Sequence, residues 1–355
     1  MLPPLPSGDD AIFAAERLLL IFWEIPSEDD GMTIARLDTP LRATWELHSP
    51  AGVMAPPAAL TVAERLVDAG LFYVTLLVRP LAHPAIAGIL GVLKSNGIQV
   101  QATFDGTEEE WQGVAALESL PETYVDAGAF LVRGDASEWD ALRQALERLR
   151  QFGAQPALMM VPDRQKLPFL PQLCDFCRSS GVTRIKLPNT PVDASFPGHS
   201  AALLPEIAQL AALQAVVTDP VTLRAGLTLE VHDLFLWEIL FPGEREHGRS
   251  EYGGCQAANS LAHITANGTV YPCSSWPYEL GSLLDKDFTA IWQQEARFVI
   301  LDKIAALPAG CEGCGDYGRC FGGCRGLVET LRTAADDGRD LLCSGRRSSS
   351  RNGCE

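Results

Sequence analysis

Blocks of apolar and polar residues alternate along the chain between residues 41 and 190, and their spacing predicts strands and helices in turn. Leu71–Val78 (LFYVTLLV) is a continuous apolar run, as expected of a strand buried on both faces. Ser137–Gln151 has apolar residues at helical spacing, and Gly153 follows as a stop signal. Thr61–Asp68 opens with the T-x-x-E spacing of a capping box, which predicts the start of another helix.

The same criteria predict an alternating series of strands and helices. The predicted strands are Thr44–Leu47, Leu71–Val78, Ile98–Phe104, Thr123–Val132, Ala157–Val161 and Val182–Leu187. The predicted helices are Thr61–Asp68, Pro84–Ser95, Glu108–Leu117, Ser137–Gln151 and Pro168–Ser179. Roughly six βα repeats with short connections imply an α/β fold with a parallel sheet and outer helices. Six units are too few for a closed eight-stranded barrel, so a partial (β/α)6 barrel is favoured over a doubly wound sheet.

Composition and charge narrow the possible functions. The formal net charge is −17, and no stripe of Lys and Arg is present, which argues against nucleic-acid binding. The first residues lack the charged and apolar regions of a secretory signal, and the early apolar run Leu18–Trp23 is too short to span a bilayer. We therefore expect no membrane association and a cytoplasmic location, where clustered cysteines bind metal more often than they form disulfides.

Seven of the ten cysteines fall between residues 255 and 343, and the first 173 residues contain none. The spacing is C-x12-G-x4-C from Cys255 to Cys273, then C-x2-C-x5-C-x3-C from Cys311 to Cys324, then Cys343. Between the first two cysteines, Asn267-Gly268 separates two short apolar runs, which predicts a β-hairpin with a type I′ turn. Such a hairpin would bring Cys255 and Cys273 to the same end.

The second group of cysteines is unusually rich in glycine, which lets the backbone approach a bound group closely and direct N–H donors at it. Sulfur ligands of an iron–sulfur cluster accept such hydrogen bonds. An iron–sulfur site is therefore the favoured interpretation. A zinc site built from three or four thiolates around Cys311, Cys314 and Cys320 stays open as an alternative, and structural disulfides are disfavoured by the expected compartment.

The cysteine pattern resembles the SPASM domain, a C-terminal module of radical S-adenosylmethionine (SAM) enzymes that modify peptides. The resemblance covers roughly residues 255–343 and implies two [4Fe–4S] clusters. By that resemblance Cys311, Cys314, Cys320 and Cys343 hold the first cluster. Cys255, Cys273 and Cys324 hold the second, whose fourth ligand is unknown. Its fourth iron is open or is met by water, a substrate or a donor such as His263 or Asn259.

The α/β region also resembles a radical SAM domain, but it lacks that family's chemistry. The family has C-x3-C-x2-C after the first strand, whereas this chain has Trp45–Pro57 without a cysteine. The family has a glycine-rich GGEP after the second strand, whereas this chain has Leu77–Pro80. Bulky Leu77 and Val78 should block the close approach that glycines allow. We therefore expect no SAM-cleaving cluster, no SAM binding, no catalytic residues of that kind and no autonomous radical SAM activity.

Degenerate proteins of this kind resemble the SPASM-domain partner of GeoRSP-type peptide-maturation systems. The resemblance implies an iron–sulfur partner that passes electrons to an active radical SAM/SPASM enzyme, or holds its short precursor peptide. The alternatives are a zinc-stabilised interaction module and an enzyme that uses an open cluster iron as a Lewis acid. The chain divides into an N-terminal extension (1–40), a degenerate radical SAM-like partial barrel (41–190), a connector (191–250), a SPASM iron–sulfur domain (251–345) and a disordered tail (346–355).

Overall fold

The computed structural model describes residues 36–117, 120–193, 197–242, 254–331 and 337–345. Most of the expected N-terminal extension (1–40) and the whole of the expected disordered tail (346–355) lie outside these residues. No helix within the described ranges is both long enough and apolar enough to cross a membrane.

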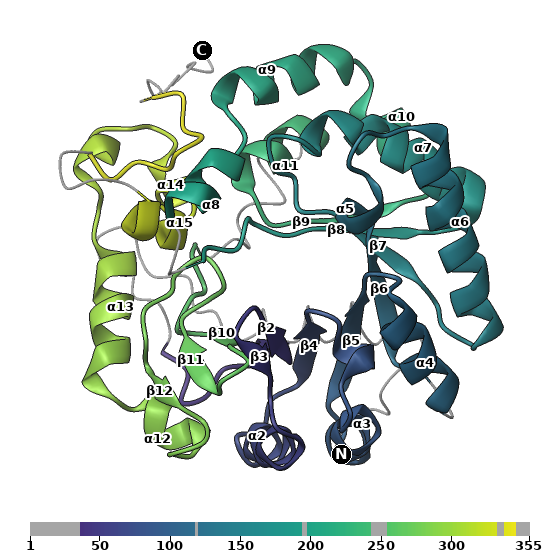
Figure 1. The fold of residues 1–355 in the computed structure, drawn as a ribbon. Coiled ribbons are helices and arrows are strands. Elements are labelled where there is room, and N and C mark those ends of the chain that lie inside the picture. The colour runs from purple at the N-terminus through teal and green to yellow at the C-terminus, as the bar shows by residue number, and fades with distance from the viewer. Residues whose placement is uncertain (1–35, 118–119, 194–196, 243–253, 332–336, 346–355) are drawn as a thin grey trace, which may run out of the picture.

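Within the described residues, ten strands form one sheet. In spatial order they are β12 (Gly281–Ser282), β11 (Thr269–Tyr271), β10 (Leu261–Ile264), β1 (Arg42–Glu46), β4 (Tyr73–Leu77), β5 (Gln99–Phe104), β6 (Glu122–Asp126), β7 (Ala157–Met159), β8 (Arg184–Leu187) and β9 (Thr228–Val231). All neighbouring pairs from β10 to β9 are parallel. Figure 1 shows these strands curving into an incomplete ring with helices outside it. The predicted open α/β barrel is confirmed.

The outer layer consists of the helices that connect the strands. They are α2 (Pro56–Asp68), α3 (Ile86–Ser95), α4 (Glu108–Ala116), α5 (Ala127–Phe130), α6 (Ala136–Gln151), α7 (Leu170–Ser180), α8 (Pro197–Leu203), α9 (Ile207–Val216), α10 (Pro220–Arg224) and α11 (Leu234–Leu240). Alternate residues of the strands, such as Trp45 and Leu76, are fully buried in the core that these helices share. The remaining strand residues face the interior of the ring, because successive strand side chains point to opposite faces.

The cysteine-rich part of the chain is joined directly to the barrel. Strand β10 pairs in parallel with β1, in the register Thr44↔His263. Strand β11 then pairs antiparallel with β10, which confirms the predicted hairpin. The rest of this part comprises α12 (Phe288–Trp292), α13 (Glu295–Ala305), α14 (Tyr317–Cys320) and α15 (Arg325–Leu331). The barrel and the cysteine-rich segment therefore share one sheet.

The segment 191–250 was expected to be a connector, but its described residues include a strand of the main sheet and several helices. Its strand β9 extends the parallel sheet beyond β8. The segment also contains two helices, α8 and α9, which are separated at Pro205. Proline has no N–H to donate and restricts the residue before it, which favours such a break.

Three local predictions need correction. Helix α2 begins at Pro56, so Thr61 lies inside it and its hydroxyl donates to the carbonyl of Pro57 rather than capping the helix. The strand expected over Thr123–Val132 ends at Asp126, whose carboxylate accepts the N–H of Gly128 and caps α5. The run Leu71–Val78, expected to be one strand buried on both faces, forms β4 only from Tyr73 to Leu77; its central residues are buried on both faces, whereas the flanking Phe72 and Val78 are 57% and 38% exposed.

Candidate metal centre

Four of the predicted ligands surround one pocket. Cys311, Cys314, Cys320 and Cys343 all line it, together with Gly310 and other residues. Cys311 ends a short 3-10 turn (Ala309–Cys311), and Cys320 ends α14. Burial raises the pKa of Cys311 to about 11, and negative charge on the other three cysteines would raise it in the same direction. The structure therefore brings these four thiols together.

The other three predicted ligands form a second, more deeply buried group. Burial raises the pKa of Cys273 to about 12, and the neighbouring Cys255 adds to the effect. The pKa of Cys324 is also raised, first by burial and then by Cys255 and Cys273. These three side chains therefore lie close enough to repel one another as thiolates.

The backbone around the three-thiol site provides donors and space for sulfur. Burial raises the pKa of Cys255, and hydrogen bonds from the N–H groups of Ala257 and Gly326 oppose that rise. A Cβ atom at Gly326 would lie 3.2 Å from Cys273 Sγ, tighter than most contacts of a real Cβ. The expectation that glycines allow close approach to the sulfur site thus holds at this position.

The hairpin brings Cys255 and Cys273 together, but its turn differs from the predicted type. Gly268 has φ +84°, whereas Asn267 is not among the residues with positive φ. Gly268 N donates to the carbonyl of Thr265 at 2.9 Å, and Thr265 N donates to the carbonyl of Thr269 at 3.0 Å. This pattern is a three-residue loop with glycine in the left-handed position rather than a type I′ turn.

A buried arginine lies between the two thiol groups. Arg325 is 5% exposed, and its Nε and Nη1 atoms have no hydrogen-bond partner within the described residues. Its positive charge lowers the pKa values of both Cys255 and Cys311, although burial dominates at each thiol. An uncompensated buried guanidinium is costly. A cluster with four thiolate ligands carries net negative charge, so Arg325 fits iron–sulfur groups at these positions.

Asp340 links the two thiol groups and was not identified from the sequence. Its Oδ2 accepts the N–H of Cys324 at 2.6 Å, and its Oδ1 accepts the N–H of Leu342 at 2.8 Å. Cys343 N donates to the carbonyl of Asp340 at 3.1 Å. A Cβ atom at Gly323 would clash with the Asp340 side chain at 2.3 Å, so glycine is required there. One aspartate therefore positions a cysteine from each group.

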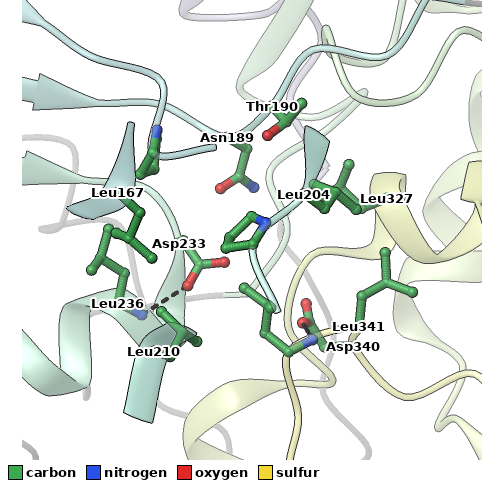
Figure 2. A pocket seen from close by; sticks show the side chains of 13 residues that line it. Leu167, Asn189, Thr190, Leu204, Leu210, Asp233, Leu236, Leu327, Asp340 and Leu341 are labelled. Carbon is green, nitrogen blue, oxygen red and sulfur yellow. Dashed lines mark hydrogen bonds between the residues drawn. The ribbon is translucent and has the colours of Figure 1, made fainter. Parts of the chain in front are cut away.

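A second pocket adjoins the four-thiol site, and Asp340 lines both (Figure 2). Its wall is mostly leucine, with Asp233, Asn189 and Thr190 as the polar members besides Asp340. Asp233 Oδ1 accepts the N–H of Leu236 at 2.8 Å and caps α11. That bond supports a structural role for Asp233 as a helix cap.

The two residues named as alternative donors to the second cluster each have a polar contact outside the thiol group. His263 Nδ1 lies 2.8 Å from Thr44 Oγ1, within hydrogen-bonding distance. Asn259 Oδ1 accepts the N–H of Leu37 at 3.0 Å. In the part of the chain that the structure describes, no group of three or more His, Cys, Asp and Glu side chains is arranged to hold a metal ion. The assignment of the seven cysteines as cluster ligands stays a prediction.

The segment where the family's three cysteines would stand is filled by core residues. Trp45 and Leu47 are fully buried and Met54 is 4% exposed, on either side of a small hairpin of β2 (His48–Ser49) and β3 (Gly52–Val53). Between β1 and α2 the chain therefore has apolar side chains packed in the core and no cysteine that could bind a cluster.

The segment at the family's glycine-rich position has an unexpected backbone. Val78 and Arg79 have φ of 58° and 48°, in the left-handed region that glycine favours. The side chain of Val78 is 38% exposed. Side-chain bulk alone does not predict this feature, in which the backbone adopts a glycine-like conformation without glycine.

The comparisons with known proteins agree with this fold. Residues 255–315 match the family model of SPASM, an iron–sulfur cluster-binding domain. The fold as a whole is a mixed α/β fold with a parallel sheet, like that of radical SAM enzymes, together with this SPASM domain. No curated protein matches the chain in sequence.

Two solved proteins illustrate the likeness. SuiB of Streptococcus suis bound to S-adenosylmethionine is 17% identical, with a TM-score of 0.64 over 87% of this chain and 78% of that one. SuiB bound to its precursor peptide SuiA also has a TM-score of 0.64 and 17% identity, over 87% of this chain and 77% of that one. Native anSMEcpe with bound AdoMet and Cp18Cys peptide is 13% identical, with a TM-score of 0.61 over 86% of this chain and 94% of that one. Similarities at these identities show the fold alone.

Proposed function

We propose that this chain is a cytoplasmic iron–sulfur partner protein of ribosomal-peptide maturation. It carries two auxiliary [4Fe–4S] clusters, lacks the cluster that cleaves SAM, and transfers electrons to an active radical SAM enzyme or holds its short precursor peptide. The finer resemblance to the GeoRSP partner protein belongs to this proposal. SuiB and anSMEcpe, which share the fold, have been solved with bound peptides, which supports a peptide as the ligand.

One contrast within the molecule carries the proposal. Seven cysteines gather in two groups beside a buried Arg325, whereas the first 173 residues contain no cysteine. In the family, three thiolates leave one iron free to bind SAM and deliver an electron to it. Trp45, Leu47 and Met54 are core residues and cannot replace those ligands. The chain therefore retains sulfur ligands for electron storage without those for radical generation.

The first experiment measures metal and SAM chemistry. Protein purified anaerobically should be brown and carry about eight irons, two cubanes of four. When reduced and mixed with SAM, it should form no 5′-deoxyadenosine above background and show no binding by calorimetry at micromolar concentration. Stoichiometric zinc without iron would favour the zinc-stabilised module instead. Protein-dependent 5′-deoxyadenosine would contradict the loss of SAM chemistry.

The second experiment tests the partner role. A complete radical SAM/SPASM enzyme and a short peptide encoded beside this chain should co-purify with it, separately or together. Omission of this chain should slow or abolish modification of the peptide. If the companion enzyme modifies its peptide at the same rate alone, the partner role is wrong.

One observation favours a second candidate function. The three-thiol site has only Cys255, Cys273 and Cys324, and the nearby His263 and Asn259 side chains are bonded to Thr44 and Leu37. A cluster with an open iron there could act as a Lewis acid on a substrate. Turnover of a candidate substrate by this protein alone would support that function over the partner role.

A further inference from the structure

The pocket drawn in Figure 2 lies at the carboxyl ends of β8 and β9, the last two parallel strands of the sheet. Asn189 and Thr190 come shortly after β8, and Asp233 follows β9 as the N-cap of α11. Leucines such as Leu167 and Leu236 form most of the remaining wall. Open parallel sheets bind ligands outside the carboxyl ends of their strands, so this is a favourable position for a binding site.

The residues after β8 are held in place by the cysteine-rich segment. Ser275 Oγ donates to the carbonyl of Thr190 at 2.9 Å, and Val192 N donates to the carbonyl of Ser274 at 2.9 Å. Ser274 and Ser275 directly follow Cys273 in the chain. The pocket therefore lies where the barrel meets the segment that carries the thiols.

Three side chains present oxygen atoms to the pocket that accept no hydrogen bond within the described residues. Asn189 Oδ1 is buried without a partner, and Thr190 is 6% exposed with a hydroxyl that makes no such bond. Asp233 is 9% exposed, and its Oδ1 accepts the N–H groups of Phe235 and Leu236, whereas its Oδ2 has no donor. In Figure 2 the Asn189 amide and the Asp233 carboxylate point into the same space. Buried acceptors without donors are costly, so the pocket is complementary to a group with several donors.

The charges around the pocket favour a donor that is also a cation. Asp340 lines the pocket as a second acid and is 5% exposed. Burial raises the pKa of Asp233, and the negative charge of Asp340 raises it further. None of the described residues that line the pocket is Lys, Arg or His, so the wall itself supplies no countercharge.

The size of the pocket limits what can enter it. Its volume is about 20 Å³, and it is partly open to solvent. A polar cavity of about 10–15 Å³ is enough for one water molecule. An ammonium group is close to water in size and therefore fits, whereas the larger, planar guanidinium group of arginine does not.

We propose that this pocket binds one primary ammonium group, whose N–H donors bond to Asn189 Oδ1, Thr190 Oγ1 and Asp233 Oδ2. A primary ammonium has three donors and no acceptor, which matches three oxygens that lack donors. The leucine wall would cover the methylene groups next to the nitrogen, as apolar surfaces cover lysine stems elsewhere. Metal ions fit less well, because Ca²⁺ takes about six to eight oxygen ligands and Mg²⁺ retains several waters.

The ammonium group can belong to a lysine side chain of a peptide or to a small alkylamine, and the probes separate these two sources. The site stands on the pocket and not on the partner role. Its test uses this chain alone, so its result is independent of whether a companion enzyme needs this chain. Preference for the peptide source would also name the residue that the proposed peptide-binding function selects.

The test is calorimetry on the full chain purified anaerobically, at pH 8, where alkylamines stay protonated. The small probes are n-butylammonium, the neutral 1-butanol, and butyltrimethylammonium, which keeps the charge without N–H donors. Butylammonium should bind at least about tenfold more tightly than the other two, the size of effect expected from hydrogen bonds to a charged group. Blocked pentapeptides Gly-Gly-X-Gly-Gly, with X lysine or arginine, test the peptide source, and lysine should be preferred by a similar factor.

Two variants locate the binding. Asp233→Asn should weaken butylammonium binding about tenfold or more, while its amide oxygen still caps α11. Thr190→Val, which removes one acceptor at nearly constant volume, should weaken it about fivefold. Asp135→Asn, the same change at the N-cap of α6 and outside the pocket, is the matched control and should leave affinity unchanged. Thermal unfolding without ligand checks that each variant folds.

The possible outcomes separate clearly. Binding of butylammonium alone supports the site with a small amine as its ligand, and a lysine preference in the peptides supports it with a peptide. Equal binding of butylammonium and 1-butanol would overturn the proposal, as would affinity that is unchanged in both Asp233→Asn and Thr190→Val. Displacement of the amine by Ca²⁺ at micromolar concentration would show a metal site instead.

Discussion

At the scale of single residues, Arg325 acts electrostatically on both groups of thiols. It is 5% exposed and its charge acts on a thiol of each predicted cluster, Cys255 and Cys311. A cation stabilises the reduced, more negative form of a nearby cluster. Arg325→Gln should therefore lower the reduction potentials of both clusters, and Arg325→Lys should restore part of the shift. Potentiometric titration followed by EPR measures the two reduction potentials. A shift in the potential of one cluster alone would contradict the position of Arg325 between the two groups of thiols.

Glu46 predicts a pH dependence of folding stability. Burial raises its pKa from 4.5 to about 7 on folding, so the folded protein binds more protons than the unfolded chain between these values. Its contribution to the free energy of unfolding therefore falls as pH rises through that window. Glu46→Gln should gain stability relative to the wild type from pH 4 to pH 8, by at most about 3 kcal/mol. Urea unfolding of both proteins at pH 4 and pH 8 measures this gain. The same difference in unfolding free energy between variant and wild type at both pH values would refute the prediction.

At the scale of elements, the start of α15 is packed so closely against Cys273 that a side chain at Gly326 would be crowded. Gly326→Ala would place Cβ 3.2 Å from Cys273 Sγ and displace a predicted ligand. We expect iron content to fall from about eight to about four per chain. Gly318→Ala is a matched control in α14, since its Cβ would meet nothing within 4 Å. Equal iron content in both variants would argue against Cys273 as a ligand.

The turn after β4 holds measurable strain. Val78 has φ 58°, which is unfavourable for a β-branched residue, and its side chain is 38% exposed, so its removal forfeits little burial. Val78→Gly should raise the free energy of unfolding by about 1 kcal/mol, measured in urea. Val53→Gly, at a 51% exposed strand position without positive φ, should lower it. Destabilisation of both to the same extent would exclude strain at Val78.

Local sequence patterns could predict the strands, the outer helices and the grouping of cysteines, because periodicity and spacing reflect short-range geometry. They could not predict that β10 pairs with β1, since those strands lie far apart in the chain and no local pattern reports their contact. Asp340 could not be recognised either, because its role depends on the N–H groups of Cys324 and Leu342. The four residues of β9 are too few to show a period.

At the scale of the whole molecule, metal binding should support more than the cysteine segment. Because β10 and β11 extend the sheet of the barrel, loss of ligation at Cys255 and Cys273 should loosen its edge. We expect iron removal by a chelator to lower the unfolding temperature of the barrel as well. Circular dichroism at increasing chelator concentration measures this. A barrel transition that stays in place after iron is lost would contradict the prediction.

The pairing of β1 with β10 also determines how this architecture can be divided. A barrel truncated before the hairpin would expose the N–H and C=O groups of β1 along a new sheet edge, and unpaired edges recruit strands from other chains. The cysteine-rich segment produced alone would carry the complementary edge on β10. Each fragment would then expose an unpaired strand edge and would be prone to aggregate. Exchange of cysteine segments between such proteins therefore succeeds only where the incoming strand reproduces the register Thr44↔His263.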